Sequence, residues 1–174
     1  MRRNNKSAEN LEAALHVVEE RGANHLTIDA VAEKAGFSKG GVLYHFGSKK
    51  ALLRGMLEQL IESMRSRAGL REGESSDLSR LLRAENQMNQ AEKRASLALL
   101  AAAAEDRELL DPARKYINQL VVDLVEEKKD VDQLVLFLAN EGLRFLEILE
   151  LNPLTPAQTR RVMDHMGKRA GELK

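Results

Sequence analysis

Eight residues between positions 27 and 49 have types and spacing that suit nucleic-acid binding. Their side chains supply hydroxyl, phenol, imidazole and ammonium groups, which donate hydrogen bonds to phosphate oxygens or to base edges. Two of the eight are glycines, which let a backbone approach a ligand closely. The eight are Thr27, Ser38, Lys39, Gly40, Gly41, Tyr44, His45 and Lys49.

Lys39 is the strongest candidate for reading a base, because a lysine can donate to O6 and N7 of guanine. A lysine that contacts phosphate, or that is simply exposed, is an equally open interpretation. His45 is expected to be a neutral hydrogen-bonding residue, since no second histidine lies near it in the sequence to complete a metal site. We therefore predict no metal and no cofactor.

Two short helices joined by a tight turn must position these groups. Thr27 is a plausible N-cap, and it precedes apolar residues at helical spacing, namely Ile28, Val31, Ala32 and Ala35. Gly36 suits the left-handed position that ends such a helix, and Ser38 can cap a second helix over 39–45. This pattern predicts a helix-turn-helix whose second helix reads DNA. Phe37 and Phe46 are expected to be core residues.

Adjacent glycines in the first turn of the second helix are unusual, because each costs about 1 kcal/mol relative to alanine in a helix. Gly40 and Gly41 therefore favour a helix whose N-terminus must come close to a DNA backbone or base edge. An ordinary loop at this point is the other open interpretation.

The stretch from about residue 7 to 55 resembles the DNA-binding domain of the TetR (tetracycline-repressor-like) family of bacterial transcription regulators. Two positions depart from the family pattern, Leu43 where a phosphate-contacting tyrosine is common and Val18 where a phenylalanine is usual. The resemblance implies phosphate contacts from Thr27, Tyr44, His45 and Lys49, with residues 38–41 facing the groove. The matching segments are Glu20-Arg21-Gly22, Thr27, Val31-Ala32, Ala35-Gly36-Phe37-Ser38, Gly40, Tyr44-His45-Phe46 and Ser48-Lys49-Lys50-Ala51-Leu52-Leu53.

Composition excludes several other classes of protein. The 174 residues carry 27 basic and 27 acidic side chains, with a net charge of +3 over residues 1–70 and −3 over the remainder. The absence of cysteine excludes disulfides, thiolate metal sites and a cysteine nucleophile. There is no His-Glu-x-x-His motif and no glycine-rich phosphate loop, so we do not expect an enzyme. No signal peptide or membrane span is apparent, and we expect a cytoplasmic protein.

Helical periodicity without strand-like alternation predicts an all-α fold of about nine helices. Residues 1–50 are expected to form the DNA-binding domain, and a helix over about 48–68 connects it to a helical regulatory and dimerisation domain over 51–174. Residues 1–6 are read as a basic arm with Arg2, Arg3 and Lys6, either reaching DNA or simply solvated. The other helices are predicted at about 7–21, 77–90, 91–105, 111–129, 131–151 and 156–173, with a polar loop at 69–76.

One helix-turn-helix buries too little surface for tight specific binding, so a homodimer is expected. The helix over 131–151 is apolar on more than one side and therefore needs a second partner besides its own core. The resemblance implies that the last helix completes an intersubunit four-helix bundle. A monomer in which the helix over 131–151 is simply central is the alternative. The predicted interface residues are Leu134, Leu138, Gly142, Phe145, Leu146, Leu149, Val162 and Met166.

The resemblance also implies a small-molecule pocket among the middle helices of the second domain. Candidate lining residues are Asn86, Met88, Tyr116, Leu120 and Asn140, which combine amides with apolar helix faces. Such a lining would suit an apolar or amphipathic effector. For any single amide, an exposed or capping role is the alternative.

These observations predict a dimeric regulator, more often a repressor in this family, that binds a palindromic double-stranded operator and is released by an effector. The alternative is a helical protein-interaction adaptor without specific DNA binding. Steep salt dependence and preference for a palindrome would separate the two.

Overall fold

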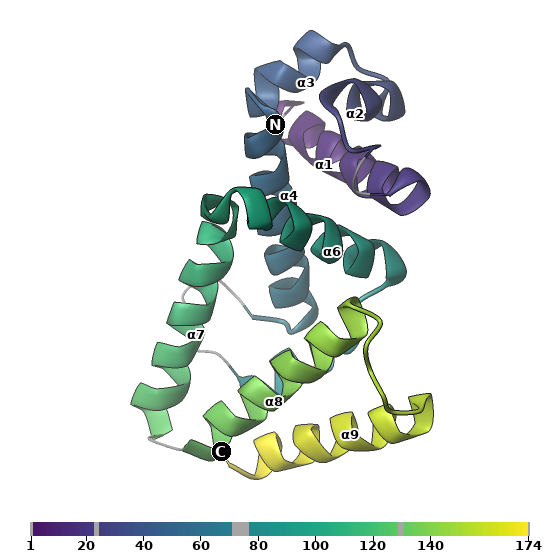
Figure 1. The fold of residues 1–174 in the computed structure, drawn as a ribbon. Helices are drawn as coiled ribbons and strands as arrows, with labels where there is room; N and C mark the ends of the chain where they lie inside the picture. Colours follow the sequence, from purple (N-terminus) through teal and green to yellow (C-terminus); the bar gives the residue numbers. More distant parts are fainter. Residues whose placement is uncertain (1, 23–24, 71–76, 129–130, 174) are drawn as a thin grey trace. The chain divides into compact units, whose positions relative to one another are not determined.

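The described part of the chain is predominantly helical, as expected from its periodicity. The computed structural model describes residues 2–22, 25–70, 77–128 and 131–173, with the backbone alone for 2–8 and 125–128. Over that part of the chain there are nine α-helices, a 3₁₀ helix before α7 and no strand (Figure 1). The α-helices are α1 (Arg2–Arg21), α2 (Ile28–Ala35), α3 (Lys39–Phe46), α4 (Lys49–Arg67), α5 (Leu78–Glu85), α6 (Gln90–Glu105), α7 (Asp111–Lys128), α8 (Val131–Ile148) and α9 (Pro156–Glu172), with the 3₁₀ helix η2 (Arg107–Leu110) before α7.

The helices form two compact units, each built from two stretches of sequence. Unit 1 combines Met1–Ile61 with Asn89–Ala113, and unit 2 combines Glu62–Met88 with Arg114–Lys174. Unit 1 thus contains α1 to α3, most of α4, α6 and η2. It is larger than the predicted DNA-binding domain of residues 1–50, because α6 and η2 pack into the same core.

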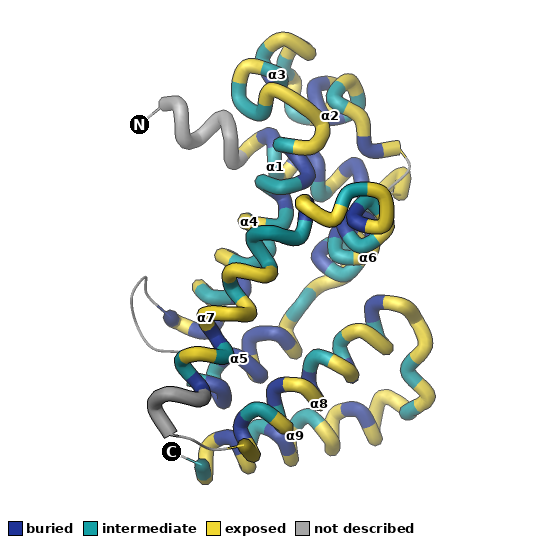
Figure 2. The backbone as a smooth tube through the Cα atoms, turned by 60° about the vertical axis from the view of Figure 1, so that its left-hand side comes forward, coloured by how far each residue is buried: buried dark blue, intermediate teal, exposed yellow. Residues whose placement is uncertain are grey.

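The core of unit 1 lies where α1 packs against α2 and α6. Val17, Val18 and Val31 are almost fully buried there (Figure 2). The Ala-rich helix α6 contributes Ala95 and Ala98, whose small side chains allow a close approach of helix backbones. This core joins the two helices of the helix-turn-helix to α1 and α6.

The core of unit 2 is built on α5, which packs against α8 and α9. Its apolar face carries Leu78, Leu81 and Leu82, each 3% exposed or less. α7 adds Leu120 and Leu124, and α9 adds Met166 and Ala170.

Three helix boundaries differ from the predictions. The backbone of residues 2–6 continues α1, so the predicted arm is helical, and the side chains of Arg2, Arg3 and Lys6 lie outside the described residues. The predicted helix over 77–90 ends at Glu85, because Asn89 caps α6 through a reciprocal hydrogen-bond pair with Glu92.

The end of α8 comes at Ile148, three residues before the predicted end. Glu150 adopts a left-handed conformation with φ 56°, and the Leu151 amide donates to the Leu146 carbonyl oxygen at 2.7 Å. This hydrogen bond closes the helix as a Schellman motif. A glutamate at this position gives no sequence signal for such an end. Most of the predicted loop over 69–76, residues 71–76, lies outside the described residues.

Among the described residues, no helix is both long and apolar enough to cross a membrane.

Candidate nucleic-acid interface

The turn between α2 and α3 is built by the caps that the sequence predicts. The hydroxyl oxygen of Thr27 accepts a hydrogen bond from the Ala30 amide at 3.0 Å, and Gly36 ends α2 with φ 69°. The hydroxyl oxygen of Ser38 accepts from the Gly41 amide at 3.0 Å. Each cap uses a lone pair of the hydroxyl and leaves its O–H to donate elsewhere. The predicted capping roles of Thr27, Gly36 and Ser38 are confirmed.

α3 is anchored by one fully buried side chain and exposes its first two residues and Tyr44. Val42 is fully buried, whereas Lys39, Gly40 and Tyr44 are exposed, the last by 69%. Phe37 and Phe46 are half-buried and pack against the core of unit 1, as predicted.

The remaining candidates follow directly along the chain. The rings of Tyr44 and His45 meet edge to face, with centroids 5.5 Å apart, and His45 and Gly41 are half-buried. Lys49 is the exposed first residue of α4, and the Ala51 amide donates a hydrogen bond to the Ser48 hydroxyl oxygen at 3.1 Å, which caps this helix. The eight candidate residues thus lie on α3, at its N-cap, at the N-cap of α2 and at the first residue of α4.

Asp29 is a polar residue at this surface that the sequence alone does not single out. Its Oδ2 accepts a hydrogen bond from Nζ of Lys39 at 2.9 Å, and both side chains are mostly exposed, by 66% and 60%. The contact joins the first turns of α2 and α3. Only the tertiary approach of the two helices brings these residues together.

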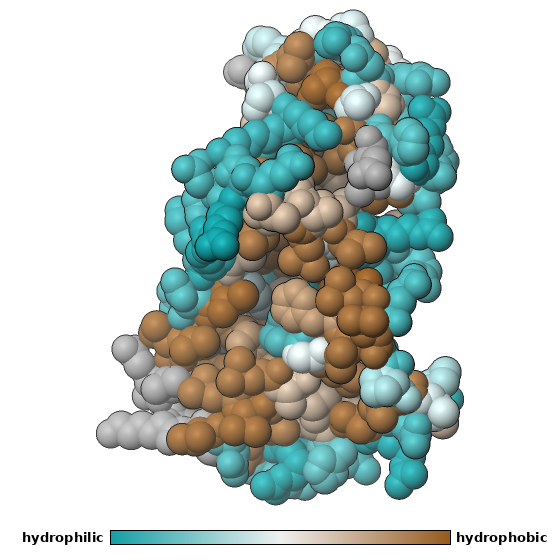
Figure 3. Space-filling view, viewed as in Figure 1, coloured by the Kyte–Doolittle hydropathy of each residue, from teal (hydrophilic) through white to brown (hydrophobic). Residues whose placement is uncertain are grey.

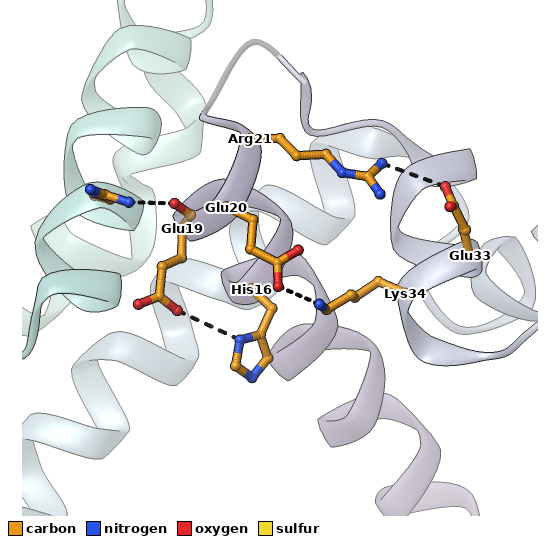
Figure 4. Close-up of polar contacts among 7 residues, drawn as sticks. His16, Glu19, Glu20, Arg21, Glu33 and Lys34 are labelled. Carbon is orange, nitrogen blue, oxygen red and sulfur yellow. Dashed lines mark hydrogen bonds and ion pairs between the residues drawn. The ribbon is translucent and has the colours of Figure 1, made fainter.

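Ion pairs join α1 to α2 at the surface, and a hydrogen bond joins α6 to α1 (Figure 4). Nζ of Lys34 lies 2.5 Å from Oε1 of Glu20, and this hydrogen bond holds the pKa of the Glu20 carboxyl below its usual value. A guanidinium N–H of Arg94 on α6 donates to the backbone carbonyl of Glu19 near the end of α1. The remaining contacts in the figure are Arg21 with Glu33 at 3.5 Å and His16 with Glu19 at 3.6 Å.

Lys50 fixes the start of α4 to the segment that follows α6. Its Nζ lies 2.8 Å from Oδ2 of Asp106 and 2.6 Å from Oε2 of Glu108. Hydrogen bonds to Asp106 and Glu108 raise the pKa of Lys50, and the hydrogen bond from Lys50 lowers the pKa of Asp106. Both ends of this contact belong to unit 1.

Unit 2 contains a cluster of polar side chains, which we term the buried polar cluster: Glu85, Tyr116, Asn140, Glu141 and Arg144. The amide of Asn140 donates to the carboxyl of Glu85, and both residues are buried. Burial raises the pKa of Glu85 to about 8, with the neighbouring Glu141 acting in the same direction. Arg144 donates two hydrogen bonds to Glu141, and burial raises the pKa of Tyr116.

The structure brings together three of the five predicted effector-site residues in the interior of unit 2. Tyr116 and Asn140 belong to the buried polar cluster, and Leu120 is 1% exposed. The hydroxyl oxygen of Tyr116 is buried and has no hydrogen-bond partner among the described residues. Asn86, in contrast, is an exposed C-cap of α5, and Met88 is half-buried beyond that helix.

Glu85 is missing from the predicted set, although its spacing could have revealed it. It follows Leu78, Leu81 and Leu82 by seven, four and three residues and therefore lies on the apolar face of α5. A carboxylate at such a position must be buried.

A stripe of exposed apolar residues runs along α8, where buried and exposed positions alternate (Figure 2). Hydrophobic residues gather over this helix in the lower part of the view in Figure 3. The stripe has steps of four and three residues, which keep it on one side of the helix. It consists of Val131, Val135, Leu138, Gly142, Phe145 and Leu149, of which Val131, Val135 and Leu138 are 69%, 55% and 64% exposed.

Most predicted interface residues therefore lie on the surface of the single chain. Leu146 and Val162 are also exposed, whereas Leu134 is half-buried and Met166 is only 5% exposed. Met166 packs into the core of its own unit. Val162 lines an open groove of about 460 Å³ along α9, together with Leu154, Gln158, Arg161, His165 and Met166.

The solved structures that resemble this chain share its fold. A TetR-family transcriptional regulator from Rhodococcus sp. is 22% identical, covers 99% of each chain and superposes with a TM-score of 0.71. A TetR-family member from Streptomyces coelicolor is 20% identical with a TM-score of 0.71, over 92% of this chain and 97% of that one. The multidrug binding protein EbrR, solved with imidazole, is 20% identical with a TM-score of 0.66, over 92% and 94%. No curated protein matches the sequence.

Two family models match the sequence, one over its N-terminal part and one over its C-terminal part. Residues 11–56 match the family described as "Bacterial regulatory proteins, tetR family", which covers the helix-turn-helix. Residues 78–170, more than half of the chain, match "Tetracyclin repressor-like, C-terminal domain". The chain therefore belongs to the TetR family of transcriptional regulators.

Proposed function

We propose that this regulator is a dimeric, ligand-responsive repressor that binds a palindromic operator through α3. The observation that carries the proposal is the outward presentation of the first turn of α3, with Lys39 and Gly40 exposed and Val42 as its buried anchor. A helix end with bare backbone and donor groups suits the major groove.

The proposed contacts divide into phosphate contacts and base contacts. The O–H of Thr27, the phenol of Tyr44, the imidazole of His45 and the ammonium of Lys49 donate to phosphates and set the register on the duplex. Ser38, Lys39, Gly40 and Gly41 approach the groove, and Lys39 reads a base. The exposed positions of Tyr44 and Lys49 on either side of Gly47 support this division.

Selection of bound sequences from random double-stranded DNA tests the proposal. We expect a palindrome whose half-site centres are one helical turn apart, about 34–36 Å, or a multiple of it. Affinity should fall steeply with salt, because each phosphate contact releases counterions. Recovery of no preferred sequence, or binding that ignores salt, would contradict the proposal and favour an adaptor role.

We propose that two copies associate through the exposed stripe on α8 together with α9. A stripe with heptad-like spacing is the surface that a second α8 can cover, and Gly142 at its centre leaves room, since a Cβ there would meet no atom within 4 Å. The groove beside Val162 on α9 can accept apolar side chains from the partner. A symmetric dimer presents two copies of α3, one for each half-site of a palindromic operator.

We propose that an amphipathic small molecule binds in unit 2 near the buried polar cluster. The buried Tyr116 hydroxyl and the Glu85 carboxyl are polar groups in an apolar interior, which is the chemistry of a ligand site. EbrR has been solved with ethidium, proflavin and malachite green. By analogy, an organic cation is a suitable first probe for this chain.

Titration with ethidium, followed by its fluorescence, tests this part of the proposal. We expect saturable binding by the wild type above pH 8, where the Glu85 carboxyl is ionised, and at least tenfold weaker binding there by Glu85→Gln, which cannot supply a negative charge. Glu62→Gln, an exposed change on α4, serves as the control. Equal binding by all three proteins would exclude Glu85 from the site.

Effector binding would be communicated through α4, because residues of this helix belong to both units. A change in the direction of α4 alters the separation of the two helix-turn-helix segments in the dimer. The effector must bind the off-operator state more tightly, and coupling free energies of about 1–3 kcal/mol are typical.

A further inference from the structure

The ion pair between Lys39 and Asp29 lies at the surface that the proposed function assigns to DNA. Asp29 is in the first turn of α2, two residues after Thr27, and Lys39 is the first residue of α3. The 2.9 Å contact joins Oδ2 of Asp29 to Nζ of Lys39. A carboxylate at a DNA-facing surface needs an explanation, because it repels phosphates.

Stability of the fold does not explain the pair. Both side chains are mostly exposed, by 66% for Asp29 and 60% for Lys39. Exposed ion pairs contribute little to folding, since water screens them and both side chains lose freedom. The helix-turn-helix is already held by its caps and by the buried Val31 and Val42.

The two side chains together form a pattern of hydrogen-bonding groups. The Lys39 ammonium has three N–H groups, one of which is used by Asp29, so two remain to donate. The second oxygen of the Asp29 carboxylate can accept. The pair therefore presents two donors beside one acceptor at the N-terminal ends of two adjacent helices.

That pattern matches one base pair better than the others. In the major groove a G·C pair offers the acceptors N7 and O6 of guanine, followed by the N4 donor of cytosine. At an A·T pair the N6 donor lies between two acceptors, so one of the lysine contacts is lost.

We infer that Asp29 is a specificity-determining residue, which acts with Lys39 as a pair to read one G·C pair in each half-site. Asp29 accepts from N4 of cytosine and keeps the Lys39 ammonium directed at guanine. It also holds the ammonium away from phosphates and so lowers affinity for random DNA. The inference rests on the proposed function, since it requires that α3 enters the major groove.

The test uses the full-length protein and the operator that wild type selects from random DNA. Affinities are measured for that operator, for variants with each base pair replaced, and for random duplex, at several salt concentrations. The proteins are wild type, Asp29→Ala, Asp29→Asn, Lys39→Ala and the double variant Asp29→Ala/Lys39→Ala. Glu33→Gln is the matched control, because it removes an acidic charge from the same helix, where its partner is Arg21 (Figure 4).

In wild type, replacing the G·C pair should weaken binding about tenfold or more, as expected for a good base contact. Asp29→Ala should reduce this preference to about threefold or less, tighten binding to random DNA, and steepen the salt dependence by about one phosphate contact as Lys39 turns to the backbone. The double variant should match Lys39→Ala in base preference. Glu33→Gln should keep the wild-type preference.

Three outcomes overturn the inference. A wild-type operator with no required G·C pair does so, and so does an Asp29→Ala protein that melts like wild type and keeps its base preference at every position. A loss of the base preference in Asp29→Asn and Glu33→Gln that parallels the loss in Asp29→Ala would assign the effect to net charge alone. Failure of wild type to prefer any sequence would instead overturn the proposed function.

Discussion

The amide of Asn140 on α8 donates a hydrogen bond to the carboxyl of Glu85 on α5, and the two residues are 2% and 7% exposed. The contact links two helices of unit 2 through their polar groups inside an otherwise apolar core. Glu141 and Arg144 on α8 and Tyr116 on α7 interact electrostatically with the Glu85 carboxyl. The protonation of Glu85 therefore bears directly on the stability of this unit.

Stability of the wild type should fall as pH rises from about 5 to 8. Burial raises the pKa of Glu85 to about 8, whereas a glutamate in an unfolded chain ionises near pH 4.3. Between these values the folded state binds more protons than the unfolded state, so raising the pH favours unfolding. Glu85→Gln keeps an oxygen to accept from Asn140 and does not ionise. Its melting temperature should exceed that of wild type by an amount that grows across this pH range.

Thermal melts at half-unit pH steps measure this difference, with the exposed Glu62→Gln as the control. A constant offset between Glu85→Gln and wild type from pH 5 to 8 would show that Glu85 is already ionised in the folded protein.

Gly40→Ala should stabilise the protein and weaken its binding to DNA. A Cβ at Gly40 would meet only the Ser38 hydroxyl oxygen at 3.9 Å, and replacing a helical glycine by alanine gains up to about 1 kcal/mol. The added methyl group would, however, separate the helix N-terminus from the duplex. Thermal melts and operator titrations with the same preparation measure both effects.

Gly36→Ala provides the opposite case. Its φ of 69° is left-handed, so alanine there should cost about 1 kcal/mol. Unchanged operator affinity in Gly40→Ala would mean that the glycine does not approach DNA.

Leu138→Glu should convert the proposed dimer to monomers. Leu138 is 64% exposed on the stripe along α8, so a charge there is tolerated by the single chain but is buried in a dimer. Sedimentation equilibrium measures the assembly, and operator affinity should fall with it because two half-sites are no longer linked. Leu97→Glu, at a 43% exposed leucine on α6, should leave the assembly unchanged. If both variants sediment as wild type does, the stripe does not form the interface.

Lys49→Met and Lys50→Met should have separable effects although the residues are neighbours. Lys49 is proposed to contact phosphate, so its loss should weaken operator binding and reduce the salt slope by about one contact. Lys50 is paired with Asp106 and Glu108, so its loss should lower the melting temperature at low salt, with the difference shrinking in 1 M salt.

The pH dependence of the Lys50 contribution follows from the two shifted groups. The pKa of Asp106 is lowered and that of Lys50 is raised, so the contribution is fully present between the ordinary pKa values of the two groups. It is lost as the pH falls through the lowered pKa of Asp106 or rises through the raised pKa of Lys50. A Lys50→Met defect that changes between pH 6 and 8 would point to another cause.

Local signals were sufficient to predict the helix-turn-helix. Thr27 and Ser38 as N-caps and Gly36 as the left-handed residue are all determined within one or two turns of chain. Such short-range patterns have few competing structures, so they transfer directly from sequence to fold. The roles of these residues toward DNA stay predictions.

Contacts between different helices are harder to predict from the sequence. The Lys39–Asp29 pair depends on how α2 and α3 cross, and the discontinuous composition of unit 1 depends on α6 returning to α1. Neither relationship leaves a periodic signal. The break at Asn86–Asn89 is different, because the Asn-x-x-Glu pattern of Asn89 and Glu92 is a local signal for it, although the helical periodicity continues across the break.

The packing of α6 on α1 limits how this regulator can be recombined with its relatives. Ala95, Ala98 and Leu99 of α6 complete the same core as Val17 and Val18 of α1, and Arg94 binds the backbone near the end of α1. A chimera that exchanges only residues 1–56 would set a foreign α1 against the native α6. Exchange of operator specificity between family members therefore requires residues 89–113 to travel with the N-terminal segment, or the substitution of α3 alone.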